Sequence, residues 1–593
     1  MEESIRTLVE TQSLVGEPGN YHLEQTLSDI QVPATVQAIL AARIDRLSRE
    51  EKNLLQTAAV IGTDVPFALL KVIANLSEEQ LHADLTQLTT AEFLYETRLF
   101  PTPEYTFKHA LTHDVAYGSL LQERRRALHA QIVEALEQLE SDRLTEQVER
   151  LAYHAIQGEV WDKVVTYSRQ VGAKASSRSR HQEAITHFEQ ALAALDHLPK
   201  NRETTEQAID VRFDLYGSHS ALNNFDLIGD LLQQTEMLAQ DLQDRRRLGR
   251  FAAYMARYLW ATVDHERAVE VGRRACAVAT ELEDLALEVV ANYVVAYAYH
   301  DLSIYRPAID LLRRNIALLE GDMIRERFGQ PILPAVQSRA ALAYCLSWQG
   351  EFIEATALMQ EALRIAEAAD HPGSISAALN MGGLVFVLKG DLDTAMSWME
   401  RGIAMIKSRQ ASPSPASLSF LAHTYTLAGR VEEALPLFDQ SLERAAAVKF
   451  LPCNSLWIGW WGEASLAMGN LEDAMQHATR ALEISRAQKE QGYEAYALRL
   501  LGNIVAHGNA SDVEQAETHY HEALVRADEL GMRPLQAHCH LDLASLYGQM
   551  ERAVEAQTEL ATATEMYREM GMMLWLAQAE AMLAENSVER SIR

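Results

Sequence analysis

Small side chains recur at a near-constant interval through the C-terminal part of the chain. One alanine returns after 39 to 47 residues, and a second small residue usually lies twelve positions before it. Turn residues at Gly350, Gly390, Gly429 and Gly469 fall between the two small positions. Small side chains let helix backbones approach closely, so the pattern predicts stacked helix pairs joined by tight turns. The alanines expected at these interhelical contacts are Ala268, Ala308, Ala355, Ala395, Ala434, Ala474, Ala516 and Ala556.

Two stretches of this pattern match a known repeat signature. They are Leu421-Ala422-x-x-Tyr425 with Gly429 and Ala434, and Leu543-Ala544-x-x-Tyr547 with Ala556. They resemble the tetratricopeptide repeat, although the period is about 40 rather than about 34 residues. We therefore predict an all-α fold built as a right-handed α-solenoid of helix pairs, with fainter units beginning near residue 145. Residues 321–334 interrupt the period and are expected to form an extended loop.

The first 130 residues follow a different pattern. Apolar residues at helical spacing predict an amphipathic helix over residues 35–47. Ser48 with Glu51, and Ser77 with Gln80, are capping-box pairs that predict the starts of two further helices. Residues 92–97 and 105–107 are predicted strands. Helices followed by a β-hairpin are typical of a small winged-helix domain.

Residues 32–140 carry a second, more specific resemblance. The stretches are VPATVQAILAARIDRL, LLQTAAVIG and EYTFKHALTHDVAYGSLLQERRRALHAQIVEAL. They resemble the region after the ATPase module in bacterial signal-transduction ATPases with numerous domains, of the kind fused to class III adenylate or guanylate cyclase domains. The resemblance covers nearly the whole chain. It implies an ATPase-module tail at 1–34, a winged-helix-like domain at 35–125, a helical connector with fainter repeats at 126–200 and the solenoid at 201–593.

One feature of that family is missing from the sequence. A phosphate-binding loop needs G-x-x-x-x-G-K-[ST], and the chain contains neither Gly-Lys-Ser nor Gly-Lys-Thr. We expect the chain to be the C-terminal portion of such a protein, either a truncated reading frame or a separated arm, and to hold no cofactor of its own.

The resemblance singles out one histidine. His109 matches the histidine that touches the β-phosphate of bound ADP in regulatory ATPases of this class, although Ala110 replaces the usual neighbouring Asp. His109 would bind nucleotide only where an ATPase module is present. His109 and His113 also share one helix face, but no third ligand for a metal accompanies them.

The composition excludes several classes of partner. Lys and Arg number 53 against 83 Asp and Glu, and the net charge of −30 opposes binding to nucleic acid. The four cysteines lie far apart, as in proteins of a reducing cytoplasm. No run of about 18 apolar residues occurs, so we expect no membrane span.

Two clusters of side chains are candidate sites. Trp457, Trp460 and Trp461 form an aromatic stripe at helical spacing. Core packing is the simpler interpretation, and a surface that anchors a partner is the alternative. His538-Cys539-His540 invites a metal interpretation, but neighbours two apart on a helix point in different directions, so packing is favoured.

The leading hypothesis is a non-catalytic regulatory arm whose solenoid binds a protein or peptide partner, because no nucleophile–base constellation is apparent. The first alternative is part of a nucleotide cyclase or ATPase whose catalytic domains lie outside this chain. The second is a winged-helix transcription regulator. Against the second stands the predicted recognition helix at 78–90, which carries Glu78, Glu79 and Asp84 but no Lys or Arg.

Overall fold

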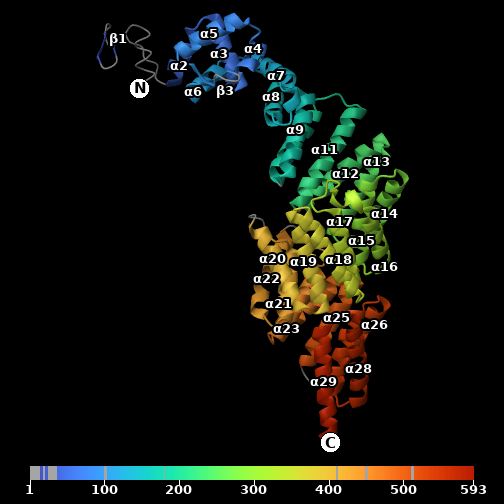
Figure 1. The fold of residues 1–593 in the computed structure, drawn as a ribbon. Coiled ribbons are helices and arrows are strands. Elements are labelled where there is room, and N and C mark those ends of the chain that lie inside the picture. The colour runs from blue at the N-terminus through green and yellow to red at the C-terminus, as the bar shows by residue number, and fades with distance from the viewer. Residues whose placement is uncertain are drawn as a thin grey trace. The chain divides into compact units, whose positions relative to one another are not determined.

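Antiparallel helix pairs account for nearly all of the computed structural model, which confirms the predicted all-α class and the tetratricopeptide-like solenoid (Figure 1). The structure describes residues 14–17, 20–23, 36–98, 103–178, 180–222, 224–408, 412–447, 452–508 and 513–592. The chain divides into two units, Met1–Ser218 and His219–Arg593, and the boundary falls within one helix. None of the helices in these ranges is both long and apolar enough to cross a bilayer.

The first unit combines helices with two small sheets. Its elements are β1 Leu14–Glu17, β2 Asn20–Leu23, α2 Val36–Asp45, α3 Arg49–Ile61, β3 Asp64–Pro66, α4 Phe67–Ala74, α5 Glu78–Thr90, β4 Leu94–Arg98, β5 Glu104–Phe107, α6 Ala110–Gly118, α7 Gln122–Leu139, η1 Ser141–Arg143, α8 Val148–Gly158, α9 Trp161–Ser177, α10 His181–Leu195 and α11 Arg202–Ala221, which crosses the boundary.

Local capping signals in the first unit are confirmed. Ser48 Oγ accepts the backbone N–H of Glu51 at 3.1 Å, and a Glu51 carboxylate oxygen accepts the Ser48 N–H at 2.9 Å. Two orphan amides at the start of α3 are thereby satisfied. The hydroxyl of Ser77 likewise accepts the N–H of Gln80 at the start of α5.

The predicted hairpin is confirmed as β4 paired antiparallel with β5. The short strand β3 adds to the other edge of β5, which gives the order β3-β5-β4 and was not predicted. The elements from α3 to β5 thus run helix, strand, helix, helix, strand, strand. Of the segment assigned to an ATPase-module tail, only the antiparallel pair β1–β2 lies among the described residues.

The second unit consists of helices alone among its described residues. They are α12 Phe225–Leu242, α13 Arg245–Ala261, α14 His265–Glu281, α15 Leu285–Asp301, α16 Tyr305–Leu318, η2 Gly321–Arg325, α17 Pro334–Trp348, α18 Phe352–Ala368, α19 Pro372–Lys389, α20 Leu392–Ser408, α21 Pro415–Leu427, α22 Val431–Ala447, α23 Asn454–Ala467, α24 Leu471–Gln488, α25 Gln491–His507, α26 Val513–Glu529, α27 Arg533–Gln549, α28 Ala553–Met570 and α29 Met573–Ile592.

The turns within the pairs need residues that tolerate a left-handed backbone. Gly350, Gly390, Gly429 and Gly469 have φ between 75° and 88°, which favours glycine because it has no Cβ. Each of these glycines joins the first helix of a pair to the second, as the repeat pattern predicts. The turn lengths therefore fix where each second helix begins.

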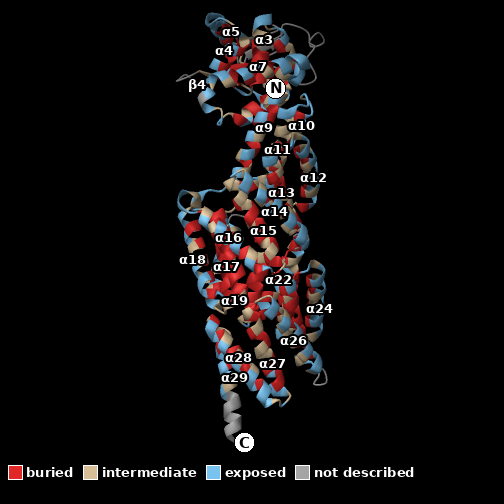
Figure 2. Cartoon of the chain, turned by 90° about the vertical axis from the view of Figure 1, so that its right-hand side faces the viewer, coloured by how far each residue is buried: buried red, intermediate tan, exposed pale blue. Residues whose placement is uncertain are grey.

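The solenoid of the second unit folds back on itself. A Cβ at Gly350 would lie 2.4 Å from Sδ of Met570, and one at Gly390 would lie 2.7 Å from a ring atom of Trp575. The turns after α17 and α19 thus touch the C-terminal helices α28 and α29. For this reason α17 and α19 are buried almost all round, and Figure 2 shows the buried residues concentrated along them.

Candidate functional site: an aromatic cavity inside the solenoid

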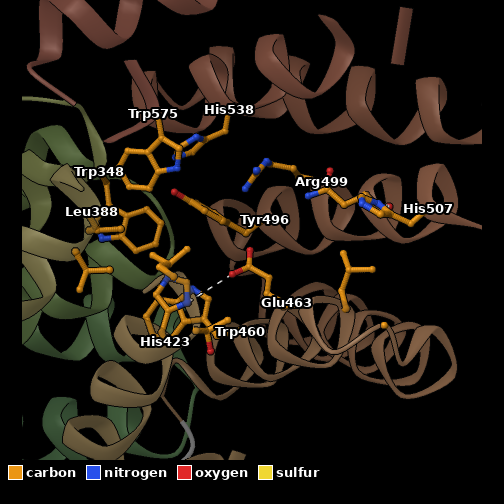
Figure 3. Close-up of a pocket in the computed structure, with 17 residues that line it drawn as sticks. Trp348, Leu388, His423, Trp460, Glu463, Tyr496, Arg499, His507, His538 and Trp575 are labelled. Atoms are coloured by element: carbon orange, nitrogen blue, oxygen red, sulfur yellow. Dashed lines mark hydrogen bonds and ion pairs between the residues drawn. The ribbon is translucent and has the colours of Figure 1, made fainter. Parts of the chain in front are cut away.

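The first helices of successive repeats enclose a cavity of about 590 Å³ in the second unit. Its walls come from α17, α19, α21, α23, α25, α27 and α29 (Figure 3). Second helices contribute no lining residue among those described, because they lie on the outer layer of the solenoid. The cavity is therefore a product of the repeat architecture rather than of one loop.

The lining positions fall at two registers to the turn glycines, four residues apart and thus on one helical face. Trp348 and Leu388 each lie two residues before the glycine that ends their helix. His423 and Glu463 each lie six residues before theirs, on α21 and α23. One helical face in each repeat therefore supplies the wall.

Aromatic rings form much of the surface. The rings of Trp348 and Tyr496 meet edge to face at 5.2 Å between centroids. Trp460 is stacked on His423 at 4.3 Å, and His538 meets Trp575 at 4.8 Å. Figure 3 shows these rings gathered around one space. Such walls bury an apolar or cationic group of a ligand well.

One carboxyl group stands among the rings. The side chain of Glu463 is 22 % exposed, and its Oε2 lies 3.5 Å from Nδ1 of His423. Burial raises the pKa of Glu463 to about 7, although Arg499 opposes the shift. Burial also lowers the pKa of His423 to about 3, with Arg499 adding to it, so this imidazole is neutral and cannot balance the carboxylate.

The cation of the cavity already has a partner. Nε of Arg499 donates to Oδ2 of Asp542 at 2.6 Å. Burial opposes its charge, but Asp542 and Glu463 raise the pKa of Arg499 above its usual value. The imidazole of His538 is uncharged, because burial holds its pKa well below the usual value. With Glu463 ionised, Arg499, Asp542 and Glu463 together carry one negative charge.

A separate buried cluster joins the early helices of the second unit to a helix that follows them much later in the chain. His265 Nε2 lies 3.6 Å from Oε1 of Glu490, and both side chains are fully buried. Asp301 lies beside them, where Oδ1 interacts with Nδ1 of His300 at 3.0 Å and accepts the hydroxyl of Tyr493 at 3.3 Å. Against the effect of burial, Glu490 and Asp301 raise the pKa of His265. These groups join α14 and α15 to α25.

The predicted repeat alanines lie in the second helices of the pairs, and all are at most 5 % exposed. The predicted tryptophan stripe is divided. Trp457 is buried in the core, Trp460 lines the cavity, and Trp461 packs between the rings of Phe438 and His477. The prediction of one partner surface made of all three tryptophans is therefore wrong.

The histidines singled out by the sequence have separate surroundings. His109 is exposed at the start of α6, and His113 packs against Phe107 and Tyr117. No metal-binding group of three or more ligands occurs within the described ranges. His538 interacts with the hydroxyl of Tyr567 at 2.8 Å and lines the cavity. His540 points elsewhere, to Glu559.

The stacked pairs and their glycine turns define the second unit as a tetratricopeptide-like solenoid. Sequence models described as tetratricopeptide repeat match residues 335–408 and 417–448. These stretches cover α17 to α22, of which α17, α19 and α21 line the cavity. None of the curated proteins matches the chain.

Several solved structures are similar to this chain in fold. A Rap protein complexed with competence and sporulation factor is 14 % identical, with 72 % of this chain and 99 % of that chain covered at a TM-score of 0.45. A signal-transduction ATPase with a tetratricopeptide repeat sensor from Pyrococcus horikoshii is 12 % identical, with 78 % and 68 % covered and a TM-score of 0.43. The APC/C hetero-tetramer Cut9-Hcn1 is 13 % identical, with 92 % and 99 % covered and a TM-score of 0.44.

Proposed function

We propose that this chain is a non-catalytic regulatory arm that binds a peptide segment of a partner inside the second unit. The observation that carries the proposal is the cavity itself. It is about 590 Å³ in volume, aromatic rings form much of its walls, and the ionisable side chains of Glu463, Arg499, His423, His507 and His538 line it. Large aromatic pockets with a few placed polar groups are the usual form of a binding site.

The first unit supplies the proposed relay. The element order from α3 to β5 supports a winged-helix domain at residues 35–125, and the resemblance of residues 32–140 implies that such a domain would lie next to an ATPase module. Binding in the solenoid would favour one arrangement of that module over another, as any ligand with unequal affinity for two states does. His109 would contact nucleotide only in that larger assembly.

A peptide-display selection on the immobilised full chain tests the proposal. Enriched peptides should bind the wild type and the Trp161→Ala variant, whose changed ring lies in the first unit. They should lose binding to Trp575→Ala, which removes one wall of the cavity. Circular dichroism checks that both variants keep their helices. Failure to enrich any peptide, or equal binding to Trp575→Ala, would refute the proposed site.

A further inference from the structure

We propose that the cavity accepts an arginine side chain of the bound peptide, with Glu463 as its counter-ion and aromatic rings as its walls. The inference rests on the proposed function, because it names the chemistry that the same cavity recognises. It follows from the balance of charges, from the placement of the rings and from the geometry of the guanidinium group.

The charges in the cavity leave a carboxylate to be neutralised. Arg499 is bound to Asp542 at 2.6 Å, so that pair is balanced. Glu463 lies 3.5 Å from the neutral ring of His423 and shares the field of Arg499 with Asp542, so the three ionised groups keep one net negative charge. An acidic ligand would have to draw Arg499 away from Asp542, which costs a partly buried ion pair. A cationic ligand completes the arrangement as it stands.

The rings around Glu463 suit a flat cation. Trp460, stacked on His423, lies on one side of the carboxyl group, and Tyr496 and Trp348 lie on another (Figure 3). Cations are attracted to the faces of such rings within about 6 Å of the centroid. The site therefore combines a carboxylate with aromatic surfaces at one place.

An arginine fits this combination better than a lysine. Its planar guanidinium stacks on rings and donates two parallel hydrogen bonds to a carboxylate. An ammonium group is more strongly hydrated and offers no flat face. The volume of about 590 Å³ also leaves room for the residues that flank the arginine in a peptide.

Four pentapeptides that differ only at the central residue test the inference. Each is acetylated and amidated, with the sequence Ala-Leu-X-Leu-Ala, where X is arginine, lysine, glutamate or citrulline. Citrulline has the shape of arginine without its charge. Calorimetric titration into the full chain at pH 8 should show the arginine peptide binding about tenfold or more tighter than the citrulline peptide, the ratio expected for one hydrogen bond to a charged group.

Two isosteric variants locate the effect. Glu463→Gln should remove the difference between arginine and citrulline. Glu472→Gln, on the exposed side of α24, should retain the full difference. Both changes preserve shape, so the helices should stay intact, and circular dichroism verifies this. An arginine preference that persists in Glu463→Gln would overturn the assignment of the counter-ion.

The remaining outcomes separate this inference from the proposed function. Equal binding of the arginine and citrulline peptides, or no binding of the arginine peptide, would contradict the inference. Tightest binding of the glutamate peptide would make Arg499 the recognising group instead. If display selection enriches peptides without basic residues that still require Trp575, the proposed function stands and the arginine inference falls.

Discussion

Replacing Gly502 with alanine should destabilise the second unit, although alanine normally favours a helix. Gly502 lies inside α25, and an added methyl carbon would lie 2.6 Å from Cε1 and 2.7 Å from Cδ1 of Tyr520. Tyr520 is buried, and its hydroxyl donates to Asn503 at 2.7 Å, so the ring cannot move freely. Overpacking costs about 1–3 kcal/mol, and the higher helix propensity of alanine returns about 1 kcal/mol. The net loss should be about 0–2 kcal/mol.

Gly459 provides the matched control on α23. A methyl carbon there would find its nearest neighbour, Cβ of Ala481, at 3.8 Å, an ordinary contact. Gly459→Ala should therefore stabilise the protein by up to about 1 kcal/mol. Urea denaturation followed by circular dichroism gives both values. Hydrogen exchange should show the loss at Gly502 confined to the neighbouring repeats. Equal stabilisation by the two substitutions would refute the close packing of α25 on α26.

Three further outcomes follow from the structure. Ala434→Leu should cost about 1–3 kcal/mol in urea denaturation because Ala434 is fully buried, whereas the surface change Glu432→Gln should cost less than about 0.5 kcal/mol. Because the pKa of Glu463 is about 7, affinity for the arginine peptide should fall about tenfold between pH 8 and pH 6, and Glu463→Gln should flatten this profile in calorimetry. The neighbours of His265 raise its pKa in the folded state. Protonated His265 therefore contributes its full stability below pH 6.5, and this contribution is lost as the pH rises through the raised pKa. In His265→Gln, the urea midpoint should lose this part of its pH dependence.

Local features of the fold could be predicted from the sequence. The capping box at Ser48 and the glycine turn at Gly429 depend on residues three or four positions apart, so short patterns specify them. The recurring small residues likewise report helix contacts between neighbours in the chain. These signals were sufficient for the helix pairs, their order and the solenoid class.

The closure of the solenoid could not be predicted in the same way. Tyr344 and Tyr493 are 149 residues apart, yet their hydroxyls lie 3.4 Å from each other. Such contacts depend on a small rotation between repeats that accumulates over several of them, and no single repeat carries that information. One sequence signal of this closure was usable. The sequence of α17, PAVQSRAALAYCLSW, has no continuous polar face, which indicates a helix that is buried on all sides.

Helical spacing alone does not show which tryptophans of the stripe share a surface. Successive residues of an α-helix are about 100° apart. Trp460 and Trp461 therefore point to opposite sides of Trp457, one into the cavity and the other toward Phe438. The better signal was the register of His423 and Glu463 against the turn glycines, which marks the inner face directly.

The location of a bound peptide on the chain tests the central claim most directly. An arginine peptide that carries a photoreactive benzophenone beside the arginine would be irradiated with the full chain, and the adducts would be mapped by mass spectrometry. The account predicts adducts on cavity residues such as Trp460 and Tyr496, which excess unlabelled arginine peptide removes and the citrulline peptide removes poorly. Adducts confined to the second helices of the pairs, or to residues 36–218, would contradict it.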